Sequence, residues 1–129
     1  MRSSILHASI CRNCPVIEIL DQLSDKWSVL VMARIVKSPV RFNELKRHLN
    51  GISQKVLTQT LKKLVRFGLI ERHAFATVPV TVEYLATPLG LSLAAVVDQL
   101  RIWSVQYQVQ IRTAQEKYDL ENNFSENKN

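Results

Sequence analysis

The chain has 129 residues, of which 47% are hydrophobic, and a formal net charge of +6 at pH 7. This size and composition fit one ordinary globular domain with its own core. Two cysteines are too few for the disulfide framework of a small secreted protein. The apolar run over residues 27–36 is too short to cross a membrane, and the first residues lack a signal-peptide apolar segment. We therefore expect a cytoplasmic protein without membrane association.

The positive charge is concentrated in one segment, residues 41–72. This segment contains eight Lys and Arg residues against Glu44 and Glu71, so its charge of +6 equals that of the whole chain. Scattered lysines would fit a merely solvated surface better. A charge block of this kind, with a sequence pI near 9.6, favours a polyanionic partner.

Capping residues and helix breakers divide the first half of the chain into short elements. Ser24 is the predicted N-cap of the second helix, Ser38-Pro39 ends that helix, and Asn50-Gly51 forms a turn before a helix capped by Ser53. We expect a flexible arm over residues 1–13, followed by helices over 15–22 and 25–37. A short strand over 40–42 and helices over 43–49 and 54–67 should follow.

The second half predicts a hairpin and a long helix. Strands over residues 69–76 and 80–87 flank Thr77-Val78-Pro79, and Thr87-Pro88 opens a helix that should reach about residue 114. The polar tail, 115–129, is expected to fray. The predicted fold is mainly α with one small β-hairpin, and one domain spans residues 14–114.

The helix over residues 54–67 carries the main functional prediction. Leu57, Leu61, Leu64 and Val65 recur at helical spacing and should face the core. The opposite face is polar and basic, which suits the second helix of a helix-turn-helix lying in a DNA major groove. A merely solvated amphipathic helix is the alternative, and the preceding helix, the turn and the following hairpin argue against it.

Position along this helix separates two predicted roles. The leading turns enter the groove deepest, where Gln pairs with adenine, Lys with guanine and the Thr methyl with thymine. The candidate base-reading residues are Gln54, Lys55, Thr58 and Gln59. Residues further along should meet phosphates, and these candidates are Lys62, Lys63 and Arg66. Arg72, near the base of the hairpin, is a further candidate, although a hairpin that only completes the core is an equal interpretation.

Several spaced motifs resemble the HxlR-type family of winged helix-turn-helix regulators, which are related to the MarR group. The matching motifs are Cys14-Pro15, Lys26-Trp27, Arg41-Phe42-x-Glu44-Leu45, Gly51-Ile52-Ser53-x-Lys55-x-Leu57-Thr58, Gly68-Leu69-Ile70-x-Arg72, Val82-Glu83-Tyr84 and Thr87-Pro88-Leu89-Gly90. Ser24-Asp25 stand where the family usually has Gly-Gly, and Val80-Thr81 where it often has Pro-Arg. The resemblance implies a winged fold, double-stranded DNA as partner and a twofold homodimer built from terminal helices.

The long terminal helix supports the same expectation of a dimer. Its apolar stripe contains Leu89, Leu93, Val96, Val97, Leu100, Trp103, Tyr107 and Ile111. The carboxyl-terminal part of this stripe extends beyond what one small core covers, so a second chain is its expected cover. Aromatic residues that line a small-molecule site are the alternative, and packing is the default interpretation.

Cys11-Arg12-Asn13-Cys14 allows three interpretations. By default Cys14 is a small structural residue at the start of a helix. Alternatively it senses an oxidant or electrophile, with Cys11 or a second subunit's cysteine as partner, because a helix amino-terminus and Arg12 both stabilise a thiolate. The resemblance implies this too, since some members use a cysteine near this position. Zinc bound by His7, Cys11 and Cys14 ranks last, because three ligands are too few for a structural site.

Two classes of function compete at this stage. One is a sequence-specific transcriptional regulator, with an oxidant or a small molecule as effector. The other is a non-enzymatic winged-helix module that binds protein. The sequence contains no nucleophile–base constellation, phosphate loop or paired carboxylates that would predict an enzyme, and it predicts no cofactor or metal.

Overall fold

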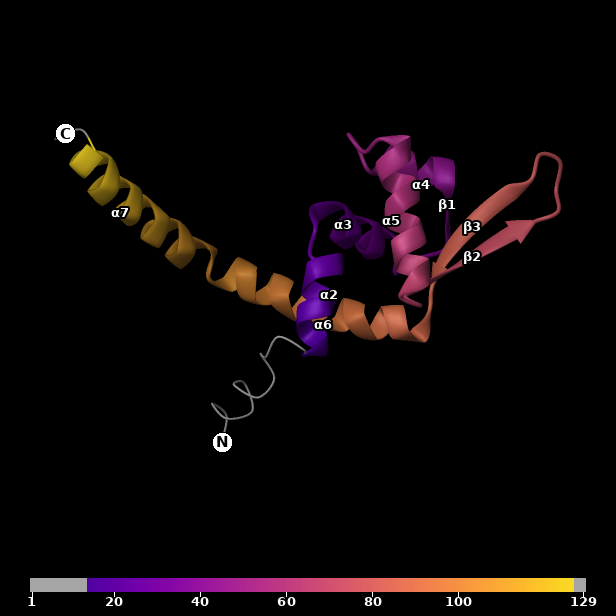
Figure 1. Ribbon diagram of the computed structural model, residues 1–129, viewed down its shortest axis with the longest axis horizontal. Helices are drawn as coiled ribbons and strands as arrows, with labels where there is room; N and C mark the ends of the chain where they lie inside the picture. The colour runs from indigo at the N-terminus through magenta and orange to yellow at the C-terminus, as the bar shows by residue number, and fades with distance from the viewer. Residues whose placement is uncertain (1–13, 127–129) are drawn as a thin grey trace. The chain divides into compact units, whose positions relative to one another are not determined.

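The computed structural model describes residues 14–126, with side chains described to residue 123 (Figure 1). Its elements are α2 (Pro15–Leu23), α3 (Lys26–Ile35), β1 (Val40–Arg41), α4 (Phe42–His48), α5 (Gln54–Arg66), β2 (Ile70–Phe75), β3 (Thr81–Ala86), α6 (Pro88–Gln106) and α7 (Gln108–Glu126). By internal contacts the chain divides into two units, Met1–Ala94 and Ala95–Asn129. The predicted fold class, mainly α with a small hairpin, is confirmed.

A three-stranded antiparallel sheet supports the first unit. Its order is β1-β3-β2, so β3 is central and pairs with both neighbours. Tyr84 on β3 lies opposite Val40 of β1 and opposite Arg72 of β2. The strands β2 and β3 form the predicted hairpin, which projects away from the helices (Figure 1).

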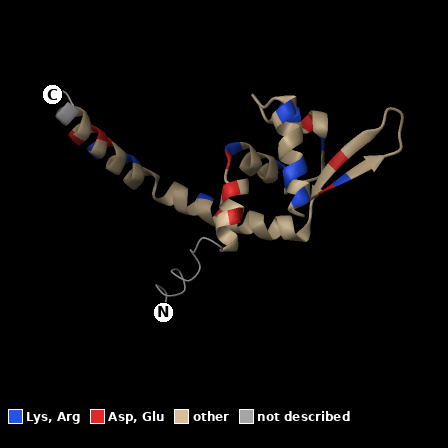
Figure 2. Cartoon of the chain, viewed as in Figure 1, with Lys and Arg blue, Asp and Glu red and all other residues tan. Residues whose placement is uncertain are grey.

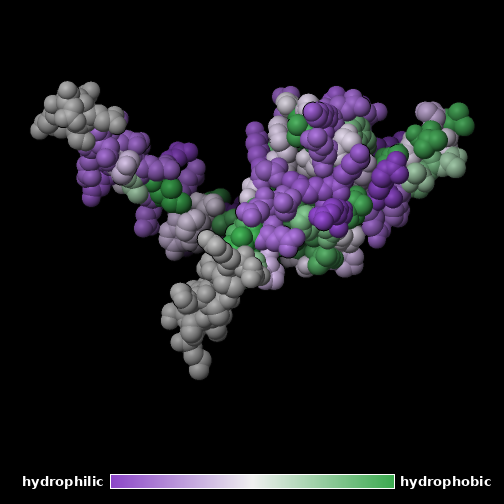
Figure 3. All heavy atoms as spheres, in the orientation of Figure 1, coloured by the Kyte–Doolittle hydropathy of each residue, from purple (hydrophilic) through white to green (hydrophobic). Residues whose placement is uncertain are grey.

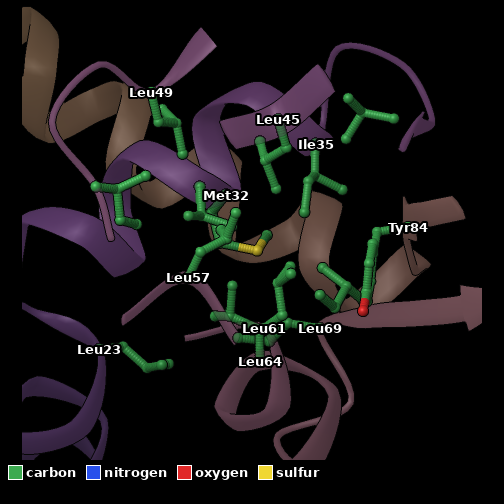
Figure 4. Close-up of a cluster of buried hydrophobic side chains, with 14 residues drawn as sticks. Leu23, Met32, Ile35, Leu45, Leu49, Leu57, Leu61, Leu64, Leu69 and Tyr84 are labelled. Carbon is green, nitrogen blue, oxygen red and sulfur yellow. The ribbon is translucent and has the colours of Figure 1, made fainter. Parts of the chain in front are cut away.

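The core of the first unit comes from helices and sheet together. Leu57, Leu61 and Leu64 of α5 are almost fully buried and pack with Val31 and Ile35 of α3. Figure 4 shows Leu57, Leu61, Leu64 and Ile35 gathered in one cluster, with Tyr84 at its margin. Burial of large aliphatic side chains is the main force that fixes α5 on α3 and the sheet. The predicted inward face of α5 is therefore confirmed for its three leucines.

Two details of the predicted core and caps are wrong. Asp25, not Ser24, caps α3: its side chain accepts a hydrogen bond from the backbone N–H of Ser28. Because Asp25 also accepts from the Ser28 hydroxyl at 2.6 Å, that small polar residue can be buried. Helical spacing in the sequence predicts Trp27, Leu30, Val31, Ile35 and the stem of Arg34 as the inward stripe of this helix. The buried residues of α3 are instead Ser28, Val31, Met32 and Ile35, and Leu30 is exposed, as is Val65 on α5.

Hydrogen bonds of Thr87 attach the start of α6 to the loop that precedes β2. The Thr87 hydroxyl donates to the carbonyl of Gly68 and accepts from the backbone N–H of Gly90. Gly90 is required here because a Cβ would lie 2.1 Å from the carbonyl oxygen of Leu69. Thr87-Pro88 therefore opens the helix as predicted.

Helical structure continues beyond the predicted end near residue 114. α6 gives way at Tyr107 to α7, which reaches Glu126. Helical bonding persists across the junction, because Tyr107 N–H donates to Trp103 O and Ile111 N–H donates to Tyr107 O. Residues 115–126, expected from the sequence to form a polar tail, are helical in the structure. No Gly or Pro follows Gly90, and Gln, Glu and Lys are good helix formers. Within the described residues, no helix has the length and hydrophobicity to span a bilayer.

Candidate nucleic-acid interface

The turn between α4 and α5 fixes the direction of α5. Gly51 has φ +94°, a left-handed conformation that other residues rarely adopt. Ile52 is buried, and the Ser53 hydroxyl accepts from the backbone N–H of Val56, which caps α5. A side-chain contact adds to this: Arg34 of α3 donates from Nε to His48 Nδ1 of α4 at 3.2 Å. α4, the turn at Gly51 and α5 therefore form a helix-turn-helix, and the bond from Arg34 attaches α4 to α3.

The outer face of α5 gathers most of the predicted DNA-binding residues. At about 100° per residue, six of them fall within an arc of about 140° that excludes the three buried leucines. The exposed members are Gln54, Lys55, Gln59, Lys62 and Arg66, and Thr58 is half-buried beside them. Figure 2 shows Lys and Arg following α5. The helix thus presents one polar, basic surface to solvent.

Lys63 lies at the edge of that arc and has a different environment. Its ammonium donates to Asp25 at 2.9 Å, so it pairs with the residue that caps α3. Burial raises the pKa of Asp25, but hydrogen bonds from Ser28 and Lys63 outweigh it and lower that pKa to about 2. Asp25 is therefore ionised at neutral pH and links α5 to α3.

The hairpin places Arg72 at its base and apolar residues at its tip. Arg72 is exposed, and the neighbouring His73 and Glu71 interact at 3.0 Å. Val78 and Val80 at the tip are exposed, and the end of the hairpin is hydrophobic in Figure 3. The charge of the hairpin is thus confined to the strands, near α4 and α5.

Two hollows adjoin α4 and the hairpin, and both involve residues to which the sequence assigned no role. The outer hollow, about 710 Å³, is lined by Arg41, Phe42, Asn43, Glu44, Arg47 and residues 79–82. The inner hollow, about 350 Å³, is lined by Phe42, Thr58, Leu61, Lys62, Val65, Arg72 and Tyr84. Arg41 and Arg47 belong to the basic segment, so charge alone could have suggested them. In the sequence Val82 and Tyr84 alternate with Thr81 and Glu83, which predicts only that one face of this strand packs inward.

The cysteine predictions fall partly outside the described residues. His7 and Cys11 lie there, so the predicted zinc set and the Cys11 partner are not placed. Cys14 is half-buried, occupies the N-cap position of α2 and makes no side-chain cap hydrogen bond. Within residues 14–126, no three His, Cys, Asp or Glu side chains gather as a metal site.

A helix-turn-helix followed by an antiparallel hairpin defines the class of winged helix-turn-helix DNA-binding proteins. Residues 22–112 match the HxlR-like helix-turn-helix family, and the chain belongs to this family. It is therefore a transcriptional regulator of the helix-turn-helix type.

Sequence and structure comparisons agree on this class. The chain is 37% identical over 90 residues to the HTH-type transcriptional regulator YtfH of Escherichia coli (strain K12), covering 70% of this chain and 71% of YtfH. The solved structure of the transcriptional regulator ytfH from Salmonella typhimurium has a TM-score of 0.70 at 32% identity, covering 82% of this chain and 95% of that one. The oxidised redox regulator HypR has a TM-score of 0.66 at 33% identity, covering 72% of this chain and 96% of HypR.

Proposed function

We propose that the protein regulates transcription as a homodimer that binds a pseudo-palindromic operator through α5 of each subunit. The observation that carries this proposal is the two-faced α5, with its leucines buried and its polar, basic face exposed. Dimeric helix-turn-helix proteins place such helices in successive major grooves, so the half-sites should be centred about 10 base pairs apart or a multiple of that.

Exposed apolar side chains of the second unit support the homodimer. Leu100 and Trp103 are 61% and 51% exposed, and the Trp103 and Tyr107 rings lie 5.6 Å apart between centroids. Large apolar side chains exposed in this way are typical of an interaction surface. A second copy of the chain is the cover that the HxlR-like family implies.

The proposed contacts follow the position of each side chain on α5. Gln54, Lys55, Thr58 and Gln59 read base edges, while Lys62 and Arg66, with Arg72 of the hairpin, meet phosphates. We assign Lys63 to positioning, because its ammonium already pairs with Asp25. The difference between the two lysines is one of environment: Lys62 is exposed, and Lys63 has a side chain only 26% exposed.

Selection of bound duplexes from a random DNA pool tests the proposal. We expect enrichment of one inverted repeat, and an affinity for it that falls steeply with salt, because each phosphate contact releases counterions. Enrichment of no sequence, with equally weak binding to every duplex, would contradict operator recognition. It would favour the protein-interaction alternative.

A redox response through Cys14 is a second proposal, supported by the position of its thiol and by the likeness to HypR, which is described as a redox regulator. Two such thiols, one from each subunit, form a disulfide when they lose two protons and two electrons. Hydrogen peroxide would accept them and be reduced to two water molecules.

Oxidant-dependent binding tests this second proposal. Mild peroxide should change the affinity of the native protein for its selected operator, and Cys14→Ser should abolish the response while Cys11→Ser keeps it. Non-reducing electrophoresis should show a covalent dimer that disappears with dithiothreitol and in the Cys14→Ser variant. An unchanged oxidant response in Cys14→Ser would leave Cys14 a structural residue.

A further inference from the structure

Tyr84 is a buried residue whose hydroxyl has no hydrogen-bond partner among residues 14–126. The residue is only 8% exposed on the central strand β3. Among the described residues its hydroxyl makes no hydrogen bond, yet none of their fully buried side-chain oxygens is left unpaired. The hydroxyl is therefore not sealed from solvent, and Tyr84 is one of the residues that line the inner hollow. A phenol is an effective donor once an acceptor occupies that hollow.

The charged groups around the inner hollow are both positive. Lys62 comes from α5 and Arg72 from β2, where Arg72 is the cross-strand partner of Tyr84. No carboxylate lines the hollow, and within the described residues neither cation forms an ion pair. The Thr58 hydroxyl adds a further polar group. These donors and cations favour an oxyanion, while the remaining walls of the hollow, from Phe42, Leu61 and Val65, are apolar.

The location of the hollow identifies which oxyanion. In duplex DNA one sugar-phosphate backbone separates each major groove from the neighbouring minor groove. If α5 lies in the major groove and the hairpin beside the adjacent minor groove, that backbone passes between them. The inner hollow occupies this position, because its walls come from α4, α5 and the two hairpin strands.

We propose that the inner hollow seats one backbone phosphate in each half-site, and that the Tyr84 hydroxyl donates a hydrogen bond to it between Lys62 and Arg72. This inference rests on the proposed docking of α5. It assigns Tyr84 as a binding residue whose contribution is a neutral, directional hydrogen bond, whereas the two cations contribute charge. The Tyr84 hydroxyl would fix the register of the duplex relative to α5.

Tyr84→Phe isolates the hydroxyl. Hydrogen bonds to charged groups are among the stronger ones, so we expect a loss of roughly tenfold or more in operator affinity. The salt dependence should stay unchanged because no charge is removed. Lys62→Met and Arg72→Met should lower both the affinity and the salt dependence. Tyr118→Phe, at an exposed tyrosine of α7, is the matched control and should bind as the native protein does.

Neutral methylphosphonate linkages, placed singly along the operator, locate the acceptor. One position in each half-site should weaken binding by the native protein and have a smaller effect on Tyr84→Phe, because the hydroxyl and the phosphate oxygen act as a pair. If Tyr84→Phe unfolds, which thermal melting would show, the same coupling is measured with Arg72→Met.

The outcomes separate this inference from the proposed function. Sequence-specific, salt-dependent binding by the native protein, with native affinity in Tyr84→Phe, overturns the phosphate seat and leaves the regulator intact. A weakened Tyr84→Phe that couples to no methylphosphonate also overturns it, since the hydroxyl then acts on something other than a phosphate. Absence of specific binding by the native protein is a failure of the proposed function instead.

Discussion

The two units of the chain differ in how far the large apolar side chains of their helices are buried. In α5 the large aliphatic side chains Leu57, Leu61 and Leu64 are at most 2% exposed, because α3 and the sheet cover them. In the second unit Leu100, Trp103 and Val105 are all more than half exposed. Among the described residues of that unit, none is classed as buried.

In the first unit the chain buries its own apolar side chains, whereas in the second unit they stay exposed and available to a partner. Burial of an apolar side chain is worth about 1.5–3 kcal/mol. The first unit gains this stabilisation from its own elements. In our proposal the polar face of α5 binds DNA, the second unit buries its apolar residues in the dimer, and dimerisation and operator binding are therefore linked.

Charged substitutions on the apolar surface of α6 should have the largest effect on dimerisation and on operator affinity. Introducing two charges through Leu100→Glu and Trp103→Glu should abolish the dimer, because a buried unpaired carboxylate is strongly unfavourable. Loss of bivalent binding should then weaken operator affinity by roughly 100-fold or more. Light scattering over a range of concentrations, combined with duplex titration, measures both effects.

Val105→Glu is the matched control for this pair. It makes the same kind of change on the same helix, but about 140° around the axis from Leu100. We expect it to retain the dimer and the operator affinity. A native protein that is monomeric at every concentration would refute the homodimer, and equal disruption by Val105→Glu would show that the interface surrounds α6.

The same contrast explains what could be predicted from sequence. The elements of the first unit were predicted to within a few residues, because caps such as Ser53 and breakers such as Ser38-Pro39 and Gly51 act locally. Leu30 was misassigned because helical spacing allows two adjacent stripes. Only the burial of Ser28, made possible by its bonds to Asp25, decides between them.

Residues brought together across the fold were the least predictable. Lys63 fits the basic face of α5 by spacing alone, and its pairing with Asp25 depends on how α5 crosses α3. Tyr84 read as an inward-facing strand residue, and only the register with Arg72 and the position of α5 place it at the inner hollow. The helix was predicted to end near residue 114 because the polar sequence beyond it was taken to indicate fraying, whereas α7 reaches Glu126.

Base-reading residues should give the next largest effect. Gln54→Ala or Gln59→Ala should relax preference at particular base pairs, by about 1–3 kcal/mol for each lost two-bond contact. The physical reason is that the leading turns of α5 reach base edges while the DNA backbone holds the register. Affinities for matched and mismatched duplexes at fixed salt measure the change.

Phosphate contacts should behave differently from base contacts. Lys62→Ala or Arg66→Ala should weaken binding to all duplexes alike and lower the slope of log affinity against log salt by about 0.9 per contact. Lys63→Ala is the internal comparison, since its paired ammonium should leave that slope unchanged. If Lys62→Ala altered base preference while Gln54→Ala and Gln59→Ala changed only overall affinity, the proposed docking of α5 would be wrong.

The smallest effect should come from the link between the two helices, Asp25 and Lys63. Asn caps helices about as well as Asp, so Asp25→Asn removes mainly the ion pair. The pair is partly exposed, with side-chain exposures of 48% for Asp25 and 26% for Lys63. We expect a loss of about 0.2–1 kcal/mol in the free energy of unfolding at pH 7.

The pH dependence of this small effect identifies its origin. Because folding lowers the pKa of Asp25 from 3.8 to about 2, its stabilisation is complete above about pH 4 and disappears as the pH falls towards 2. The unfolding free energies of the native protein and Asp25→Asn should therefore converge over that range in denaturant titrations. Asp98→Asn, which breaks the exposed pair with Arg101, is the control and should stay near the native curve throughout. A difference between native protein and Asp25→Asn that persists at pH 2 would assign the effect to the cap instead of the charge, and Lys63 would then remain available to meet DNA.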